Sequence, residues 1–182
     1  MNAGTKRNSF TQFLKSFFPN RDDNLFRGIP LSTNGKLFVS PMPFGAYDPG
    51  NRLMKIYKRR NIDHVFILVT DDELIRKARR KLLDQYRAAG LEYSRFVIKD
   101  WMVPSLEVAR AMTDKAKSLL GTKRVVVHCH AGVGRTAVAV CCIGMFIEGW
   151  TAQEAIRNIC RAMPVNISDE QRRFIDKYAD SL

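Results

Sequence analysis

The segment VVVHCHAGVGRTAVAV, residues 125–140, constrains the fold more than any other part of this 182-residue chain. Its continuous run of valines predicts a strand that is buried on both faces, as in the centre of a parallel sheet. Two glycines then interrupt the apolar sequence, and a second apolar run from Thr136 to Ile147 predicts a helix. The loop between them is therefore expected to leave the carboxyl end of a central strand, where open α/β sheets bind their ligands.

Alternating strand and helix patterns surround this segment. They predict an α/β fold with a central, mostly parallel sheet of about four to five strands flanked by helices. The expected strands span residues 36–40, 64–70, 92–98 and 124–128. The expected helices are a short one from Asp48 and Pro49, a long basic one from Asp71 or Asp72 to about Ala89, helices over 106–120 and 136–147, and two that begin at capping boxes, 151–154 and 168–171.

The length suits one domain with a substantial core. We expect an N-terminal extension over residues 1–35 and the domain itself over residues 36–182. Within the extension, Phe10 to Phe18 place apolar side chains on one face of a helix. We expect this helix to pack on the core, and the alternative is a helix that lies in a membrane interface. With no apolar run of spanning length and no signal peptide, the sequence predicts a soluble, cytoplasmic protein.

The net charge narrows the class of ligand. Lys and Arg number 30 and Asp and Glu number 18, which gives a formal charge of +12. A field of this sign attracts anions, such as nucleic acid, an acidic membrane or a small polyanion. The basic run at residues 76–81 has no interleaved aromatic residues on which bases could stack, so we do not expect nucleic acid as a partner.

The loop itself has the form Cys, five residues, Arg, from Cys129 to Arg135. Its backbone N–H groups and the positive end of the following helix are expected to form a nest for an anion. The same field favours a thiolate at Cys129, and Arg135 supplies a planar fork for two oxygens of a tetrahedral anion. Adjacent residues rarely ligate one ion, so we expect no metal at His128, Cys129 and His130. The expected phosphate-binding residues of the loop are His130, Ala131, Gly132, Val133 and Gly134.

The sequence HCHAGVGRT resembles the signature of the protein tyrosine phosphatase superfamily, and the preceding strand and following helix agree with it. The resemblance implies the fold of that superfamily and a phosphatase that needs no cofactor. It also implies that Cys129 attacks phosphorus to form a cysteinyl-phosphate and that Arg135 binds the phosphoryl oxygens. Thr136 would hydrogen-bond the departing thiolate, and His128 would orient the loop. Covalent catalysis of this kind divides one difficult displacement into two easier ones.

Two further segments resemble loops of the same superfamily. KDWMVPS supplies Asp100 as the expected general acid, although Ile98 and Lys99 replace the usual Trp-Pro before it. Other candidates for the acid are Asp71, Asp72 and Glu73, which are expected to cap a helix. ISDEQRRF resembles the late loop with two glutamines, of which only the second is present, as Gln171. Gln171 or Asn166 is therefore the candidate for positioning the hydrolytic water, and Gln171 alternatively only caps a helix.

The substrate is expected to be a phosphorylated small-molecule polyanion or a phosphoprotein. The size resembles the compact dual-specificity group, and the positive charge favours a ligand with several phosphates. The loop also resembles that of the phytase-like branch, which implies myo-inositol polyphosphates as substrates. The alternatives are a tyrosine or dual-specificity protein phosphatase, and beyond these a phosphoinositide or RNA 5′-phosphatase. The sequence leaves the oligomeric state open.

Overall fold

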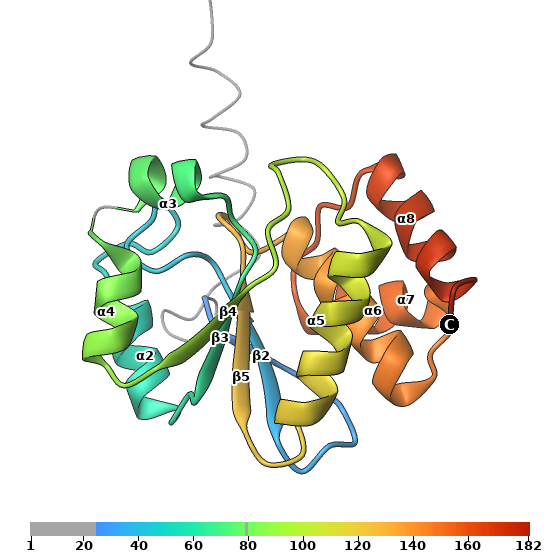
Figure 1. Cartoon of the computed structure of the whole chain (residues 1–182), viewed down its shortest axis with the longest axis horizontal. Helices are drawn as coiled ribbons and strands as arrows, with labels where there is room; N and C mark the ends of the chain where they lie inside the picture. Colours follow the sequence, from blue (N-terminus) through green and yellow to red (C-terminus); the bar gives the residue numbers. More distant parts are fainter. Residues whose placement is uncertain (1–24, 79) are drawn as a thin grey trace, which may run out of the picture.

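The computed structural model describes residues 25–78 and 80–182 (Figure 1). The strands are β1 (Arg27–Ile29), β2 (Lys36–Ser40), β3 (His64–Ile67), β4 (Glu92–Arg95) and β5 (Arg124–His128). The helices are α2 (Leu53–Arg59), α3 (Asp71–Lys77), α4 (Leu82–Ala88), α5 (Leu106–Leu119), α6 (Arg135–Glu148), α7 (Ala152–Ala162) and α8 (Asp169–Ala179).

The strands of the described chain form one five-stranded sheet in the order β1-β2-β5-β3-β4. The valine strand β5 is central and runs parallel to β2 and β3, and β1 is an antiparallel edge strand on β2. Val125, Val126 and Val127 are completely buried, as expected for a strand covered on both faces. The α/β fold with a mostly parallel sheet is therefore confirmed.

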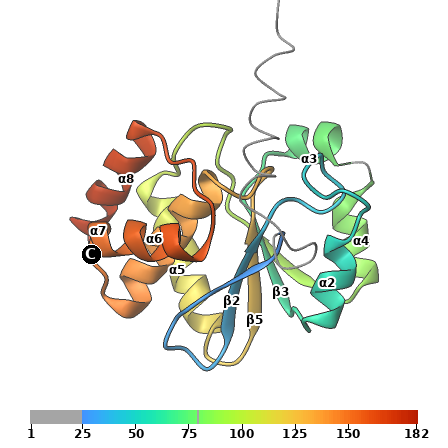
Figure 2. The same cartoon turned by 180° about the vertical axis from the view of Figure 1, so that it is seen from behind.

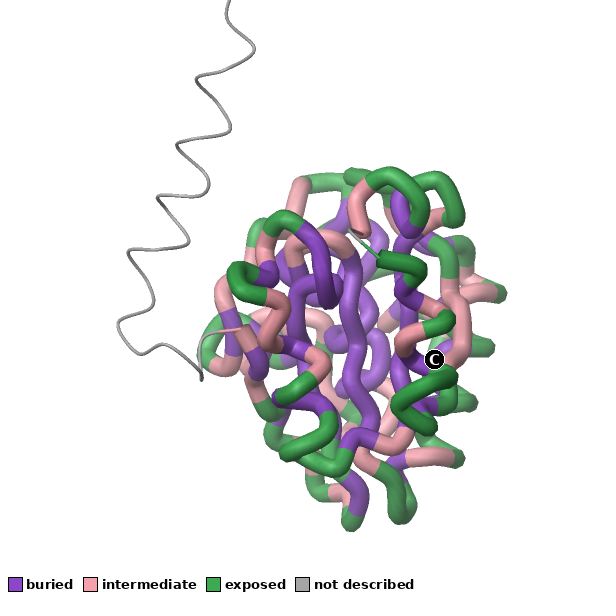
Figure 3. Tube along the Cα trace, turned by 90° about the vertical axis from the view of Figure 1, so that its left-hand side faces the viewer, coloured by how far each residue is buried: buried purple, intermediate pink, exposed green. Residues whose placement is uncertain are grey.

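Helices cover both faces of the sheet. Figures 1 and 2 show α2 and α4 on one side and α5 to α8 on the other, with α3 at the end where the parallel strands finish. Helix α6 packs against α5, α7 and α8, and all its residues from Arg135 to Met145 are buried. The buried part of the chain runs through the middle of the molecule, with exposed residues around it (Figure 3). Helix α6 is therefore the central support of the loop that precedes it.

Two predicted helices differ from the structure. The long basic helix is divided into α3 and α4, because the chain becomes extended at Ala78. A continuous helix would place like charges four residues apart at Arg76 with Arg80 and at Lys77 with Lys81, which is unfavourable. The short helix begins at Leu53 and not at Asp48.

The helix starts show which polar residues act as caps. The side chain of Asp48 is buried and accepts backbone N–H bonds from Phe44, Arg52 and Leu53, so it organises the loop before α2. Thr70 caps α3 in place of Asp71 or Asp72. The predicted cap at Ser105 and the capping boxes that start at Thr151 and Ser168 are confirmed.

Part of the predicted extension, residues 25–35, contributes β1 to the sheet. The predicted amphipathic helix at residues 10–18 lies outside the described residues. Within the described ranges, no helix combines the length and hydropathy that crossing a bilayer requires.

Candidate active site

The loop from Cys129 to Gly134 follows β5 directly and closes tightly against the end of β2. Gly132 has a positive φ of 80°, and a Cβ at this position would lie 2.6 Å from the carbonyl oxygen of Ser40. Only glycine therefore fits here. The backbone N–H of Gly132 donates to Sγ of Cys129 over 3.2 Å.

Neighbouring segments fix the loop from two sides. The N–H of Met42 donates to the carbonyl of His130 over 3.1 Å, and the N–H of Asn166 donates to the carbonyl of Val133 over 3.1 Å. At its end the loop passes into α6, where Gly134 occupies the N-cap without a capping side chain. The first N–H groups of α6 thus lack a capping side chain, and together with the helix dipole they make this end of the helix electropositive.

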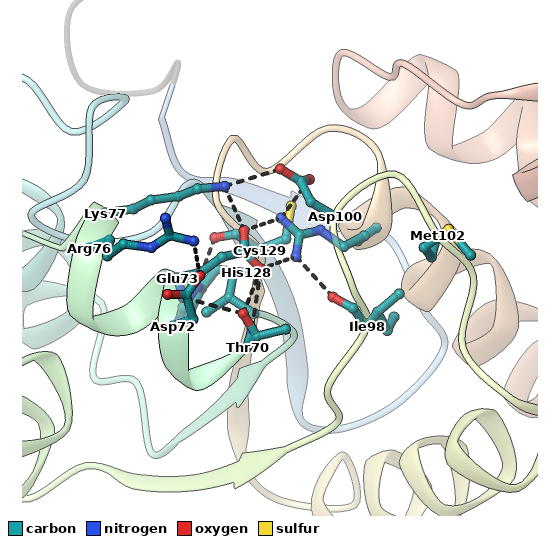
Figure 4. A network of polar contacts seen from close by, with 12 residues as sticks. Thr70, Asp72, Glu73, Arg76, Lys77, Ile98, Asp100, Met102, His128 and Cys129 are labelled. Atoms are coloured by element: carbon teal, nitrogen blue, oxygen red, sulfur yellow. Dashed lines mark hydrogen bonds and ion pairs between the residues drawn. The ribbon is translucent and has the colours of Figure 1, made fainter.

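The guanidinium of Arg135 is buried, and its acceptors come from three residues that are labelled in Figure 4: Glu73, Ile98 and Asp100. Its Nη1 and Nη2 donate to the two carboxylate oxygens of Glu73 over 2.7 and 2.8 Å. Nη1 also donates to the carbonyl of Ile98 over 2.9 Å, and Nη2 forms an ion pair with Asp100 over 2.9 Å. Burial opposes the charge, but the bonds to Glu73 outweigh it and raise the pKa of Arg135.

Glu73 is the site residue whose role the sequence did not reveal. Its place in the sequence predicts only a helix cap or a general acid. In the structure it does complete the capping box with Thr70. Burial raises its pKa, but hydrogen bonds from Arg135 and Lys77 outweigh this and lower the pKa to about 2. A carboxylate in this state holds no proton to donate near neutral pH, so its position fits a structural partner of Arg135. The Thr-x-x-Glu pattern signalled only the cap.

The other two carboxylates at the start of α3 have partners of their own. Asp71 pairs with Arg95, and Asp72 pairs with Arg76 on the exposed side of the helix. Neither pair includes a residue of the Cys129 loop, whereas Glu73 of the same helix bonds Arg135 directly after the loop.

Asp100 lies at the open side of the same network. Its Oδ1 is 2.9 Å from Nη2 of Arg135, and its Oδ2 is 3.0 Å from Nζ of Lys77. The side chain is 48% exposed, so it faces both the loop and the solvent. The structure thus brings the predicted acid to the predicted phosphate-binding arginine. Lys77, which also bonds Glu73 over 2.8 Å, is a second residue that the sequence did not single out.

His128 is completely buried behind the loop. Its Nδ1 is 3.0 Å from the carbonyl oxygen of Cys129, which can only accept, so Nδ1 carries the proton. Nε2 therefore accepts from the hydroxyl of Tyr86 over 2.8 Å. Burial lowers the pKa of His128 to about 4 and raises that of Tyr86, so both groups are neutral over the physiological range. Tyr86 and the carbonyl of Cys129 thus hold the imidazole of His128 between them.

His130 is the loop residue that follows Cys129, and its side chain is partly buried. Burial, together with the charge of Lys77, lowers its pKa to about 4, so the ring is neutral near pH 7. The ring of Tyr47 contacts it edge-on, with the centroids 5.1 Å apart.

Three polar residues named from the sequence lie beside the loop. Oγ1 of Thr136 is buried and has no hydrogen-bond partner among the described residues. Gln171 accepts from the N–H of Ser168 and donates to the carbonyl of Met102, which joins α8 to the segment of Asp100. A Cβ on Gly134 would lie 3.6 Å from Oε1 of Gln171 and 3.2 Å from the carbonyl of Asn166. Gln171 therefore caps α8 and also borders the loop.

No group of three or more His, Cys, Asp or Glu residues in the described part of the chain is arranged to hold a metal ion. Cys141 and Cys142 are buried in α6, where burial raises their thiol pKa, and Cys160 is exposed on α7. The thiol next to the anion nest is that of Cys129.

The fold and the site are together those of the protein tyrosine phosphatase superfamily. Residues 47–148 match a family model described as "Polymorphic toxin system, DSP-PTPase phosphatase". This match covers more than half of the chain, and the chain belongs to that family. The family implies phosphorylated substrates.

Comparison with curated proteins finds partial matches. The chain is 37% identical over 75 residues to mouse protein tyrosine phosphatase domain-containing protein 1, which covers 41% of this chain and 10% of that protein. It is 25% identical over 128 residues to mouse cyclin-dependent kinase inhibitor 3, covering 69% of this chain and 61% of the relative. The chain thus spans a tenth of the length of the first relative and less than two thirds of the second.

Solved structures share the fold. Kinase associated phosphatase with its catalytic cysteine changed to serine gives a TM-score of 0.77 at 16% identity, covering 86% of this chain and 94% of the other. The active form of Tk-PTP gives 0.70 at 24% identity and covers 86% and 98%. PTPMT1 in complex with PI(5)P gives 0.70 at 20% identity and covers 86% and 95%.

Proposed function

We propose that this phosphatase works through a cysteinyl-phosphate intermediate and that its main substrates are myo-inositol polyphosphates. The observation that carries the mechanism is the network in which buried Arg135, fixed by Glu73, meets Asp100 beside the Cys129 loop. Transfer of a phosphoryl group to sulfur requires three groups: a thiolate, a planar cation that binds the phosphate oxygens, and a proton donor.

In the first step the thiolate of Cys129 attacks phosphorus. An S–P bond forms and the ester P–O bond breaks, while Asp100, which takes up a proton from solvent when it leaves the ion pair with Arg135, gives that proton to the departing oxygen. The equatorial oxygens are bound by the loop N–H groups and by Arg135, whose Nη2 must exchange the carboxylate of Asp100 for a phosphoryl oxygen. Glu73 keeps the guanidinium in place during this exchange, because it holds both terminal nitrogens.

In the second step water attacks the cysteinyl-phosphate. The S–P bond breaks, inorganic phosphate leaves, and Asp100 takes a proton from the water. The hydroxyl of Thr136 stabilises the returning thiolate, and His128 keeps the loop oriented through its bond to the Cys129 carbonyl. Gln171 and Asn166 border the loop at Gly134, and one of them orients the water.

The substrate proposal is supported by charge. An excess of +12 strengthens the binding of a ligand with several phosphates more than that of a single phosphotyrosine. One structural neighbour, PTPMT1, was solved with PI(5)P. The alternative is a tyrosine or dual-specificity protein phosphatase, in keeping with the dual-specificity type of the family.

The proposed substrate preference is tested by measuring phosphate release in the presence of EDTA. Purified protein is compared on myo-inositol hexakisphosphate, a phosphotyrosine peptide and nitrophenyl phosphate. We expect the highest kcat/KM on the inositol substrate. A higher value on the peptide would make this a protein phosphatase, and no release from any of the three would contradict phosphatase activity itself.

A pair of cysteine variants tests the covalent step. Cys129→Ser is expected to bind substrate and to release no phosphate, because a hydroxyl replaces the nucleophilic thiolate. The matched control is Cys160→Ser, which removes an exposed thiol on α7 and is expected to keep full activity. Turnover by Cys129→Ser would refute the cysteinyl-phosphate. Trapping of phosphate on the wild-type protein by rapid acid quench gives a direct readout.

A further inference from the structure

Four large apolar side chains are exposed on the two segments that border the candidate active site. The exposed fractions are 79% for Ile75, 43% for Val97, 66% for Trp101 and 46% for Met102. One other large apolar side chain in the described part of the chain is exposed, that of Leu182, and it lies outside both segments. We call Ile75, Val97, Trp101 and Met102 the apolar rim. Clustered exposure of this kind marks an interaction surface.

The apolar rim belongs to segments that the site network holds together. Ile75 lies on α3 two residues before Lys77, whose ammonium bonds Asp100 over 3.0 Å. The other three members lie in the segment of Asp100, which is tied on its far side by the bond from Gln171 to the carbonyl of Met102. Figures 1 and 2 show α3 and this segment at the same end of the molecule.

Trp101 adds a backbone observation. Its φ is +67°, in the left-handed region that large side chains rarely adopt. In this conformation the residue after Asp100 exposes two thirds of its indole to solvent instead of packing it in the core. Backbone outliers that persist at a site point to a function of the residue.

The charges on the same segments select the partner. Among the described residues of 71–81 and 97–102, five basic side chains are exposed or half-exposed against three exposed acidic ones, and each acidic one is already paired with a basic side chain. The basic residues are Arg76, Lys77, Arg80, Lys81 and Lys99. A soluble polyphosphate would use these cations but not the apolar rim. Aromatic and aliphatic side chains set among Lys and Arg are typical of surfaces that enter the interface of an anionic bilayer.

We propose that the apolar rim docks this phosphatase on an anionic membrane surface with the Cys129 loop facing the lipid headgroups. Contact with the bilayer is peripheral, through Trp101 and its apolar neighbours. At the membrane the loop also reaches inositol phosphate monoesters in lipid headgroups, in addition to the soluble polyphosphates of the proposed function. Docking itself does not depend on the proposed function, whereas the identity of the headgroup as substrate rests on it.

Trp101 supplies a direct probe of docking. The chain has two tryptophans, so Trp150→Phe leaves Trp101 as the single fluorophore. Vesicles of phosphatidylcholine with phosphatidylserine are expected to shift its emission to the blue, and phosphatidylcholine alone is expected to do so far less. Thermal unfolding of Trp150→Phe checks its fold. No shift with the anionic vesicles would overturn the proposal and leave the apolar rim to a protein partner.

A double variant separates docking from chemistry. Ile75→Ser with Val97→Ser is expected to weaken sedimentation with anionic vesicles by about tenfold, because it removes two of the four apolar contacts. Activity on nitrophenyl phosphate is expected to be unchanged. Leu182→Ser, equally exposed but outside the apolar rim, is the control and should change neither readout. Undiminished sedimentation of the double variant would overturn the proposal.

Two further comparisons distinguish docking from the proposed function. Cys129→Ser is expected to bind anionic vesicles as the wild type does, so docking can be measured when catalysis is absent. On phosphatidylinositol phosphate in these vesicles the double variant should lose about tenfold in rate, with no loss on the soluble headgroup. Equal rates of wild type and double variant on the vesicles would overturn a role of the apolar rim in substrate delivery.

Discussion

At the scale of single residues, the contact between Glu73 and Arg135 explains most about this site. Both side chains are buried, and the carboxylate binds both terminal nitrogens of the guanidinium. Buried ion pairs are destabilising to break, because one uncompensated charge remains inside the protein. The pair therefore links the stability of the fold to the orientation of the arginine that follows the Cys129 loop.

The pH dependence of stability should report this pair. The pKa of Glu73 falls from its usual 4.5 to about 2 in the folded state. Its contribution to stability is therefore present above pH 4.5 and is lost as the pH falls through about 2. Urea unfolding between pH 6 and pH 2 is expected to show this loss in the wild type.

Glu73→Gln should remove that acid-dependent part and lower the free energy of unfolding at pH 7 by about 3 to 5 kcal/mol. Asp72→Asn breaks the exposed pair with Arg76 on the same helix and serves as its control, with an expected change below about 1 kcal/mol. Equal effects of the two variants would show that the Glu73–Arg135 pair adds nothing beyond a surface pair.

The role of Asp100 as proton donor is tested by comparing the rate loss of a variant on substrates with poor and good leaving groups. Asp100→Asn should slow hydrolysis of an inositol phosphate by about 10² to 10⁴-fold, because an alkoxide needs a proton to leave. Nitrophenyl phosphate, whose leaving group is stable without one, should lose far less. Similar losses on both substrates would assign the proton donor to another residue. Steady-state kcat values for the two substrates are sufficient for the comparison.

At the scale of elements, the tight turn at Gly132 determines the shape of the loop. Gly132→Ala adds a Cβ within 2.6 Å of the Ser40 carbonyl at a positive φ, so the loop must move away from β2. We expect a loss of at least about a hundredfold in kcat, since a displacement of about 1 Å can cost that much.

The control, Gly90→Ala, has a similar positive φ but nothing within 4 Å of the added Cβ. It should lower stability by about 1 kcal/mol and leave kcat unchanged. Full activity of Gly132→Ala would mean that the loop tolerates a different path.

The same elements show what a sequence can predict. Strand β5, the glycine loop and α6 are contiguous, and their local patterns predicted all three. Asp100 was found because its segment resembles a known loop. The contact from Glu73 to Arg135 spans 62 residues and depends on how α3 is placed over the sheet, which no local pattern encodes. The break between α3 and α4 was missed because helical propensity continues through a run whose like charges repel in a helix.

At the scale of the whole molecule, the charge of +12 predicts a strong response to salt. Raising the ionic strength shortens the range of the field, so a ligand with many charges loses more attraction than one with few. The KM for myo-inositol hexakisphosphate should rise steeply with added NaCl, and the KM for nitrophenyl phosphate should rise only slightly. Parallel changes in the two values would show that the basic surface does not contribute to substrate binding.

The carboxylate of Asp100 on Nη2 of Arg135 also makes the unliganded site its own competitor. An incoming anion must replace a full negative charge before it gains the arginine. Phosphate monoesters carry close to two charges at neutral pH, whereas sulfate esters and phosphate diesters carry one. We therefore expect the exchange to favour phosphate monoesters over monoanions of the same shape before any chemistry begins.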